Sequence, residues 1–118
     1  MEKIIAGLIK GRHEMPVNAY IFEDAIADVF DFDAIRKHII TWISGNVGVV
    51  SRDFQRGINQ ASDDDVRCFV GEKSLTVYVT GLTLVTAELI RVCAYFGVRL
   101  TLMHYNSVTG DYESQCIF

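Results

Sequence analysis

A short turn with two hydroxyls and a glycine, Thr80-Gly81-Leu82-Thr83, stands where the pattern changes from a strand to a helix. Before it, 75–80 is rich in β-branched residues; after it, 83–96 carries apolar side chains at helical spacing. The first amides of a helix lack partners, and the helix dipole favours an anion there. Ligands of open α/β sheets gather at that edge, so the turn predicts an anion site where Gly81 admits close approach. The alternative is an ordinary turn with Thr83 as N-cap.

A second polar group, Met103-His104-Tyr105-Asn106, closes the next strand and is followed by Gly110-Asp111-Tyr112. The two-residue period of a strand points His104 and Asn106 to one face and Tyr105 to the other. If this strand lies parallel beside 75–80, its polar end emerges at the same edge of the sheet as the Thr80–Thr83 turn. The alternative is a hairpin with polar residues at its tip.

A third group, Gly11-Arg12-His13-Glu14, brings a cation, a titratable ring and a carboxylate into one loop. Arg12 can clamp a phosphate through two hydrogen bonds, whereas the alternative is a solvated loop of mixed charge. The run 63–65 consists of three consecutive aspartates, and calcium loops space their acids alternately, so we interpret the run as solvated. We expect no metal and no cofactor.

The elements that must position these groups form an α/β pattern. Strands are predicted at 3–9, 17–22, 75–80, 98–104 and 112–117, with weaker signals at 47–51 and 66–70 around a loop at 52–65. One helix runs from an Asp31 or Asp33 cap to Ser44 and stops at Gly45-Asn46; the other spans 83–96 and stops at Gly97. Short links make 75–104 a βαβ unit, so strands 75–80 and 98–104 should be parallel. The prediction is one domain, 1–118, with a mixed sheet, two main helices and an antiparallel C-terminal hairpin.

Composition limits the partners. The 118 residues carry a net charge of −4 without a basic stretch, which argues against long nucleic acid but permits a small phosphorylated ligand. No apolar run approaches the roughly 20 residues of a membrane span, and the first residues do not form a secretory signal. Cys68, Cys93 and Cys116 show no metal or redox spacing, so we expect reduced core cysteines in a cytoplasmic protein.

The chain is also unusually apolar for its size. Half of its residues are apolar and the mean hydropathy is +0.22. The helix 83–96 is apolar over most of its circumference, which predicts cover from its own sheet and from another subunit, with Leu89 facing that subunit. We therefore expect a homodimer or a higher homo-oligomer.

Taken as one unit, 75–115 resembles a known family. Strand, Thr-Gly, apolar helix, a strand ending His-Tyr-Asn and then Gly-x-Tyr-x-x-Gln is similar to the phage-carried Thoeris anti-defence sponge family, as is KGRHEMPV near the start. The C-terminal third also resembles small CRISPR-associated ring nucleases that bind cyclic oligoadenylate.

The resemblance to the sponges implies a function. Such proteins sequester the cyclic nucleotide signal of a bacterial immune system, such as a cyclic ADP-ribose isomer or a cyclic oligonucleotide, without cleaving it, in the host cytoplasm. Their pockets lie between subunits, and the turn before the apolar helix grips the base. Carried over, this implicates Gly81, Leu82, Thr83, Leu84, Asn106 and Asp111. An aromatic residue is expected in that turn for stacking, and Leu82 stands there instead.

Two alternatives stay open. A ring nuclease would need a carboxylate after the tyrosine, where this chain has Asn106, which is a poor metal ligand and no base. His104 can act as an acid or base but has no evident partner in the sequence. A structural or protein-binding module explains the apolar helix equally well and leaves the polar strand ends unexplained.

Overall fold

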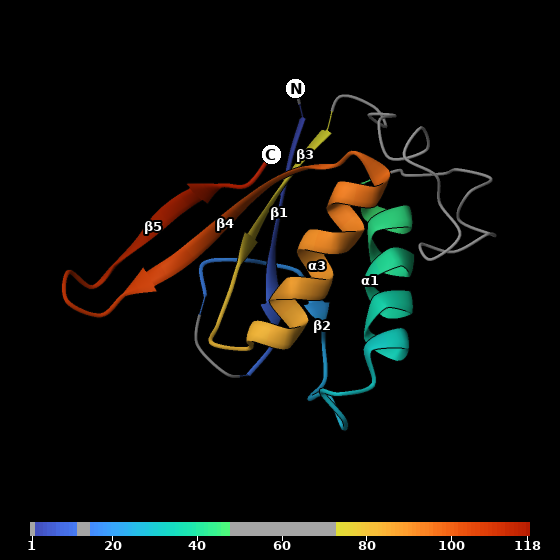
Figure 1. The fold of residues 1–118 in the computed structure, drawn as a ribbon. Coiled ribbons are helices and arrows are strands. Elements are labelled where there is room, and N and C mark those ends of the chain that lie inside the picture. Colours follow the sequence, from blue (N-terminus) through green and yellow to red (C-terminus); the bar gives the residue numbers. More distant parts are fainter. Residues whose placement is uncertain (1, 12–14, 48–72) are drawn as a thin grey trace.

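Five strands and two helices make up the described part of the chain. The computed structural model describes residues 2–11, 15–47 and 73–118. The elements are β1 (Glu2–Ile9), β2 (Tyr20–Phe22), α1 (Phe32–Asn46), β3 (Lys73–Tyr78), α3 (Thr83–Phe96), β4 (Arg99–Asn106) and β5 (Asp111–Cys116). They build a mixed sheet in the order β2-β1-β3-β4-β5 (Figure 1).

The predicted parallel pair is confirmed as neighbouring strands in this sheet. β3 and β4 run parallel from the pair Ser74–Arg99 to the pair Tyr78–Met103. β1 is parallel to both β2 and β3, and β5 is antiparallel to β4. The predicted α/β class with a C-terminal hairpin is therefore the observed one, although β3 starts and ends two residues earlier than predicted.

Both helices cover the same face of the sheet (Figure 1). Alternate residues of the three central strands point into the layer between sheet and helices, because side chains alternate along a strand. The fully buried members of this layer include Ala6, Leu8, Leu75, Val77, Leu100 and Leu102. The helices contribute Ile35, Ile39 and Ile43 from α1 and Val85, Leu89 and Val92 from α3. This layer is the core.

The β1–β2 connection lies on the opposite face of the sheet. Connections between parallel strands are right-handed. The chain moves from β1 to β2 in one direction across the sheet and from β2 to β3 and from β3 to β4 in the other, so the first connection and the two helices lie on different faces. In Figure 1 the β1–β2 connection passes behind the strands. Gly7 is required beneath it. A Cβ atom at Gly7 would lie 2.6 Å from ring carbons of Tyr20 and 2.9 Å from the sulfur of Met15.

Two helix ends follow the predicted signals, the start of α1 at Asp31 and the end of α3 at Gly97. Asp31 caps α1 by accepting a hydrogen bond from the backbone N–H of Ala34 at 3.2 Å. Gly97 ends α3 in the left-handed conformation, with φ of 69°, where a glycine is favoured. The predicted stop at Gly45-Asn46 is wrong. α1 continues through both residues to a C-cap at Val47, because the buried face of the helix extends to Ile43 and Val47.

The second cover of α3 within this chain comes from α1. Leu89, predicted to face a partner, is 0% exposed in the core, so that prediction is wrong. The two helices are joined by a buried ion pair in which Arg36 Nε and Nη2 donate to Glu88 Oε2 and Oε1 at 3.1 and 3.2 Å. Arg36 also bonds the exposed Asp33 at 3.1 Å. The bond to Glu88 raises the pKa of Arg36, so the guanidinium stays charged.

Other predictions fall in part outside this structure. The weak strand signals at 47–51 and 66–70, the loop 52–65 and Cys68 belong wholly or almost wholly to residues that are not described. Cys93 is buried as predicted, but Cys116 lies exposed on the edge strand β5, so it is not a core cysteine. No helix in the described ranges has the length and apolar character needed to cross a membrane.

Removing the charge of Glu88 should destabilise the fold strongly. The side chains of Arg36 and Glu88 are only 10% and 11% exposed, so Glu88→Gln leaves a buried guanidinium without its carboxylate. We expect a loss of about 3–5 kcal/mol in the free energy of unfolding, measured by urea denaturation. The control Asp33→Asn removes a carboxylate that is 77% exposed and should cost less than about 1 kcal/mol. Equal losses would contradict the buried pair.

Two glycine substitutions should have opposite effects. Gly7→Ala forces Tyr20 or Met15 to move and should destabilise the protein by about 1–3 kcal/mol. Gly45→Ala meets no atom within 4 Å in the interior of α1 and should stabilise it by about 0.5–1 kcal/mol. Thermal unfolding of the two variants measures both. A neutral Gly7→Ala would mean that the β1–β2 connection does not pack closely on the sheet.

Candidate functional site

The amino end of α3 has no side-chain cap. Its N-cap is Leu82, and no side chain of the described residues accepts a hydrogen bond from the first turn. The alternative interpretation of Thr83 as N-cap is therefore wrong; Thr83 is the first helical residue, and its hydroxyl is exposed. Within the turn, Leu82 N–H bonds Thr80 O at 2.8 Å and Thr83 N–H bonds Gly81 O at 3.1 Å. The next amides, of Leu84 and Val85, have no partner among the described residues.

The other helix supplies a comparison within the same molecule. α1 begins with the Asp31 cap and carries Asp33 in its first turn, so two carboxylates offset its dipole. α3 has no acidic residue in its first turn. The end of α3 is thus a positive pole that no described carboxylate neutralises.

This helix end opens into a cleft of about 340 Å³, the turn cleft. The segment that follows β3 supplies one wall, α3 supplies a second, and β4 supplies one titratable side chain. The lining residues are Val79, Thr80, Gly81, Thr83, Thr86, Ala87, Ile90 and His104. Thr80 Oγ1 is shielded from solvent and has no hydrogen-bond partner among the described residues. The volume is in the range of small-molecule sites.

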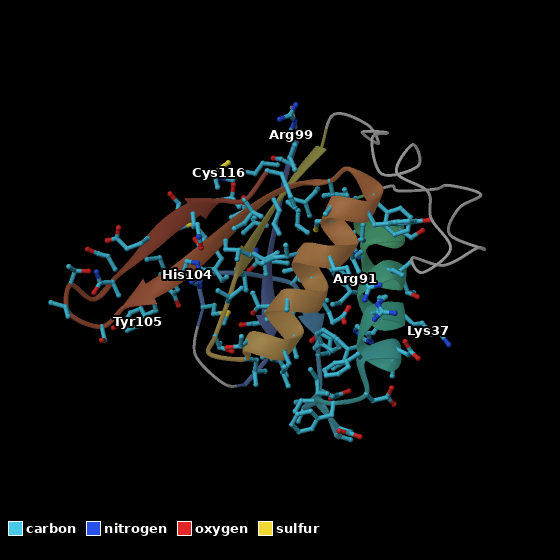
Figure 2. All side chains as sticks on the ribbon, in the orientation of Figure 1. Lys37, Arg91, Arg99, His104, Tyr105 and Cys116 are labelled. Atoms are coloured by element: carbon cyan, nitrogen blue, oxygen red, sulfur yellow. The ribbon has the colours of Figure 1, made fainter. Side chains whose placement is uncertain are left out.

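His104 joins the turn cleft from β4, as the predicted meeting of the two strand ends requires (Figure 2). Its Nε2 lies 2.7 Å from Gln115 Oε1 on β5. The prediction that His104 lacks a partner is therefore wrong. A carboxamide oxygen accepts a hydrogen bond, so the proton is placed on Nε2 and Nδ1 is left as an acceptor.

A second cavity of about 330 Å³, the switch cleft, adjoins the other side of the turn. It lies between the carboxyl ends of β1 and β3, where the strand order reverses and where open α/β sheets hold their ligands. Its lining residues are Ile9, Lys10, Gly11, Ala25, Ile26, Val29 and Leu82. Lys10 supplies a cation here, 3.9 Å from Glu23 and more than half exposed.

The structure brings together only part of the predicted site. Thr80, Gly81, Thr83 and His104 meet in the turn cleft, while Leu82 lines the switch cleft. Leu84 is 36% exposed and lines neither cleft. Arg12 and His13 lie outside the described residues, although the preceding Gly11 lines the switch cleft opposite Leu82.

The remaining predicted residues are at the hairpin tip. Asn106 accepts hydrogen bonds from the backbone N–H groups of Val108 and Thr109 at 3.0 and 3.4 Å, which holds the turn between β4 and β5. Asp111 pairs with Asn106 in the antiparallel ladder. Neither residue lines the turn cleft. The alternative interpretation of this group, a hairpin with a polar tip, describes Asn106 and Asp111, whereas His104 belongs to the cleft.

The sequence analysis missed several residues of this site, among them Val79, which also lines the turn cleft. Thr86, Ala87 and Ile90 line the turn cleft, and together with Thr83 they follow the three- and four-residue spacing of one helix face. Gln115 was also missed. In the hairpin, Glu113 is paired with His104, and Gln115 lies two positions further along β5. The predicted turn at 107–110 would have been enough to work out this pairing from the sequence.

Other parts of the molecule are less suited to an anion or to covalent chemistry. A further cavity of about 450 Å³ between β2 and α1 includes Glu23, Asp24, Asp28 and Asp31 in its lining, and these carboxylates repel an anion. Burial raises the pKa of Cys93 to about 12, so its thiol is no nucleophile at neutral pH. No group of three or more potential metal ligands gathers anywhere in the described ranges.

Comparison of the chain with protein-family models, with curated proteins and with solved structures found no match to any of them. The site is therefore interpreted from its own geometry.

An acidic residue at the start of α3 should stabilise the free protein. Thr83→Asp places a carboxylate on an exposed first-turn position with an uncompensated dipole, so we expect a gain of about 0.3–1 kcal/mol in unfolding free energy at low ionic strength. Urea denaturation with and without added salt measures it, and salt should reduce the gain. Val108→Asp, at a hairpin-tip position that is 92% exposed, is the control and should change stability little. A loss of stability in Thr83→Asp would show that the helix end is already compensated.

Proposed function

We propose that this protein binds a small phosphorylated nucleotide of the cyclic signalling type and holds it without cleaving it. The observation that carries the proposal is the uncapped, acid-free start of α3, which opens beside Thr80 and Gly81 into a cleft that His104 also lines. The sequence resemblance to the Thoeris anti-defence sponges points to the same ligand class. On this proposal the protein would counteract a bacterial anti-phage defence by removing its signal.

Each part of the turn has a role in binding an anion. The free amides at the start of α3 and the helix dipole favour a phosphate. Gly81 has no atom within 4 Å of the position that a Cβ would take, so a ligand can approach the backbone there. The hydroxyl of Thr80 has no partner among the described residues and can donate after a small rotation, and Lys10 stands across the adjoining switch cleft.

Holding is favoured over cleavage by the composition of the turn cleft. Its described lining contains one titratable side chain, His104, whereas phosphodiester cleavage by general acid–base catalysis uses a proton acceptor and a proton donor. The described partner of His104 is the neutral amide Gln115. A ring nuclease remains the second candidate, since the imidazole reaches the cleft.

The test is a thermal-shift screen of cyclic ADP-ribose isomers, cyclic dinucleotides and cyclic trinucleotides, followed by analysis of the bound compound. A ligand present at a hundred times its dissociation constant adds roughly 2.7 kcal/mol of stability, which raises the melting temperature visibly. After heat denaturation, the supernatant should contain the starting compound intact. Linear or cleaved product accumulating over many turnovers, with or without Mg²⁺ or Mn²⁺, would identify a nuclease.

Two variants locate the ligand. Gly81→Ala should fold normally, because its Cβ meets nothing in the free protein, yet weaken binding by roughly tenfold or more where the methyl intrudes on a packed contact. Thr83→Asp should also weaken binding, through repulsion, while stabilising the free protein. Val108→Asp adds the same charge far from the turn and should bind normally. Unchanged affinity in both turn variants would exclude the turn cleft as the binding site.

A further inference from the structure

The face of the sheet opposite the helices is covered only in part. Four of the five strands, β2, β1, β3 and β4, run parallel to one another in the sheet. Parallel sheets are normally covered on both faces. Among the described residues only the β1–β2 connection crosses this side, with Met15 and Tyr20 over Gly7. We call the rest the bare face; its middle row, one residue from each of β1, β3, β4 and β5, is Ile5, Thr76, Thr101 and Cys116, of which Thr76 is only 4% exposed.

Part of the exposed apolar surface of this chain lies on the bare face. Ile5, at the β1 end of the row, is 46% exposed, although β1 is an interior strand of the sheet. Toward the hairpin, Tyr105 is 45% exposed. On α3 the exposed large apolar side chain is Leu84, at the first turn, so the bare face carries two of the exposed apolar side chains and α3 one.

The hairpin end of the bare face is a tyrosine cluster. Tyr112 packs edge-on against Tyr78 and Tyr105, with ring centroids 4.8 and 5.4 Å apart. Burial raises the pKa of Tyr112, and the nearby Tyr78, Tyr105 and Tyr20 raise it further. Tyrosine is enriched in the cores of protein interfaces, because a rigid ring buries much area at low entropic cost.

The other end of the bare face is cationic. Lys3, Ser74 and Arg99 stand side by side in the ladder, and Arg99 lies at the far end of β4 from Tyr105 (Figure 2). No carboxylate of the described strands points to this face. Asp111 and Glu113 alternate with Tyr112 and so point to the other side. In a chain with a net charge of −4, this is a face that two copies can bring together without acid–acid repulsion.

We propose that the bare face is the contact between two copies of this chain, packed sheet to sheet about a twofold axis that runs perpendicular to the strands. That axis reverses the strand direction between the copies. It therefore places the Lys3–Arg99 end of one copy over the tyrosine cluster of the other, where cations contact ring faces. A twofold axis along the strands would instead oppose the cations to each other.

The size and shape of the face favour a second copy over a small ligand. Strands about 4.8 Å apart that rise about 3.3 Å per residue give the four longer strands, of six or eight residues each, a face of roughly 450 Å² before its relief is counted. A standard interface buries about 800 Å² from each partner. Small ligands prefer concave sites, and the clefts described above are lined by other residues.

The test is sedimentation velocity of the whole protein over a micromolar concentration series. The expected result is a dimer, and Ile5→Asp, which puts a carboxylate in place of an exposed apolar side chain on an interior strand, should weaken self-association by about a hundredfold or more. Lys3→Glu, at an exposed position outside the core, should weaken it by about tenfold through loss of the cation over the tyrosines. Val108→Asp adds the same negative charge at the hairpin tip and should remain dimeric.

Several outcomes would overturn the proposal. They are a wild-type monomer at 100 μM (about a hundred times a micromolar dissociation constant), a dimer that survives both bare-face variants, or a Val108→Asp variant that dissociates as readily as Ile5→Asp. If Ile5→Asp fails to fold, the sedimentation of Lys3→Glu decides the test, and far-ultraviolet circular dichroism checks that this variant is folded. A monomer whose tyrosine fluorescence is quenched by a dinucleotide, in wild type but not in Lys3→Glu, would assign the face to a nucleotide instead.

Discussion

The one-sided covering of a parallel sheet is the constraint on which the rest of this structure depends. Right-handed crossovers send the β1–β2 connection to one face and both helices to the other, because the chain first moves outward from β1 and then returns past it. The helices then share one core, and the buried pair of Arg36 and Glu88 joins them across it. Two consequences follow: a reversal of strand order beside β1, and a face of the sheet with little of its own chain over it.

The reversal of strand order determines where a ligand can enter. The connections that follow β1 and β3 leave there toward opposite faces of the sheet. The Thr80–Thr83 turn lies between the turn cleft and the switch cleft. The electrostatics of this edge differ from those of the neighbouring edge at α1. Asp31 and Asp33 neutralise the start of α1, whereas α3 begins with Leu82 and Thr83. In an acidic chain, that difference makes the start of α3 the natural position for a phosphate.

The side chains of the β4–β5 hairpin contribute to two different surfaces. On one side of β4, His104 reaches the turn cleft and is oriented by Gln115. On the other side, Tyr105 and Tyr112 belong to the bare face. Because successive residues of a strand point to opposite faces, the two proposals assign adjacent residues to different surfaces, His104 to the turn cleft and Tyr105 to the bare face. A dimer formed through the tyrosines would leave both clefts of each copy on the outer side of its sheet.

The sequence by itself determined the local elements and their order. The periods of 75–80 and 83–96, the cap at Asp31 and the stop at Gly97 depend on interactions within a few residues, and so the βαβ unit and the hairpin could be predicted. The same locality placed Thr80, Gly81 and Thr83 at a strand–helix junction. It also fixed the alternation of His104 and Tyr105.

Only the tertiary structure decided which surfaces those elements leave open. Leu89 lies on a helix so apolar that another subunit could have covered it, but α1 of the same chain does so. The contact between α1 and α3 joins residues as far apart as Arg36 and Glu88, 52 positions from each other, and no local pattern in the sequence indicates it. His104 has no partner among its neighbours in sequence, but Gln115, eleven positions away, lies 2.7 Å from its Nε2. Burial and hydrogen-bond satisfaction are properties of the whole packing, because each depends on groups that the chain brings together from a distance.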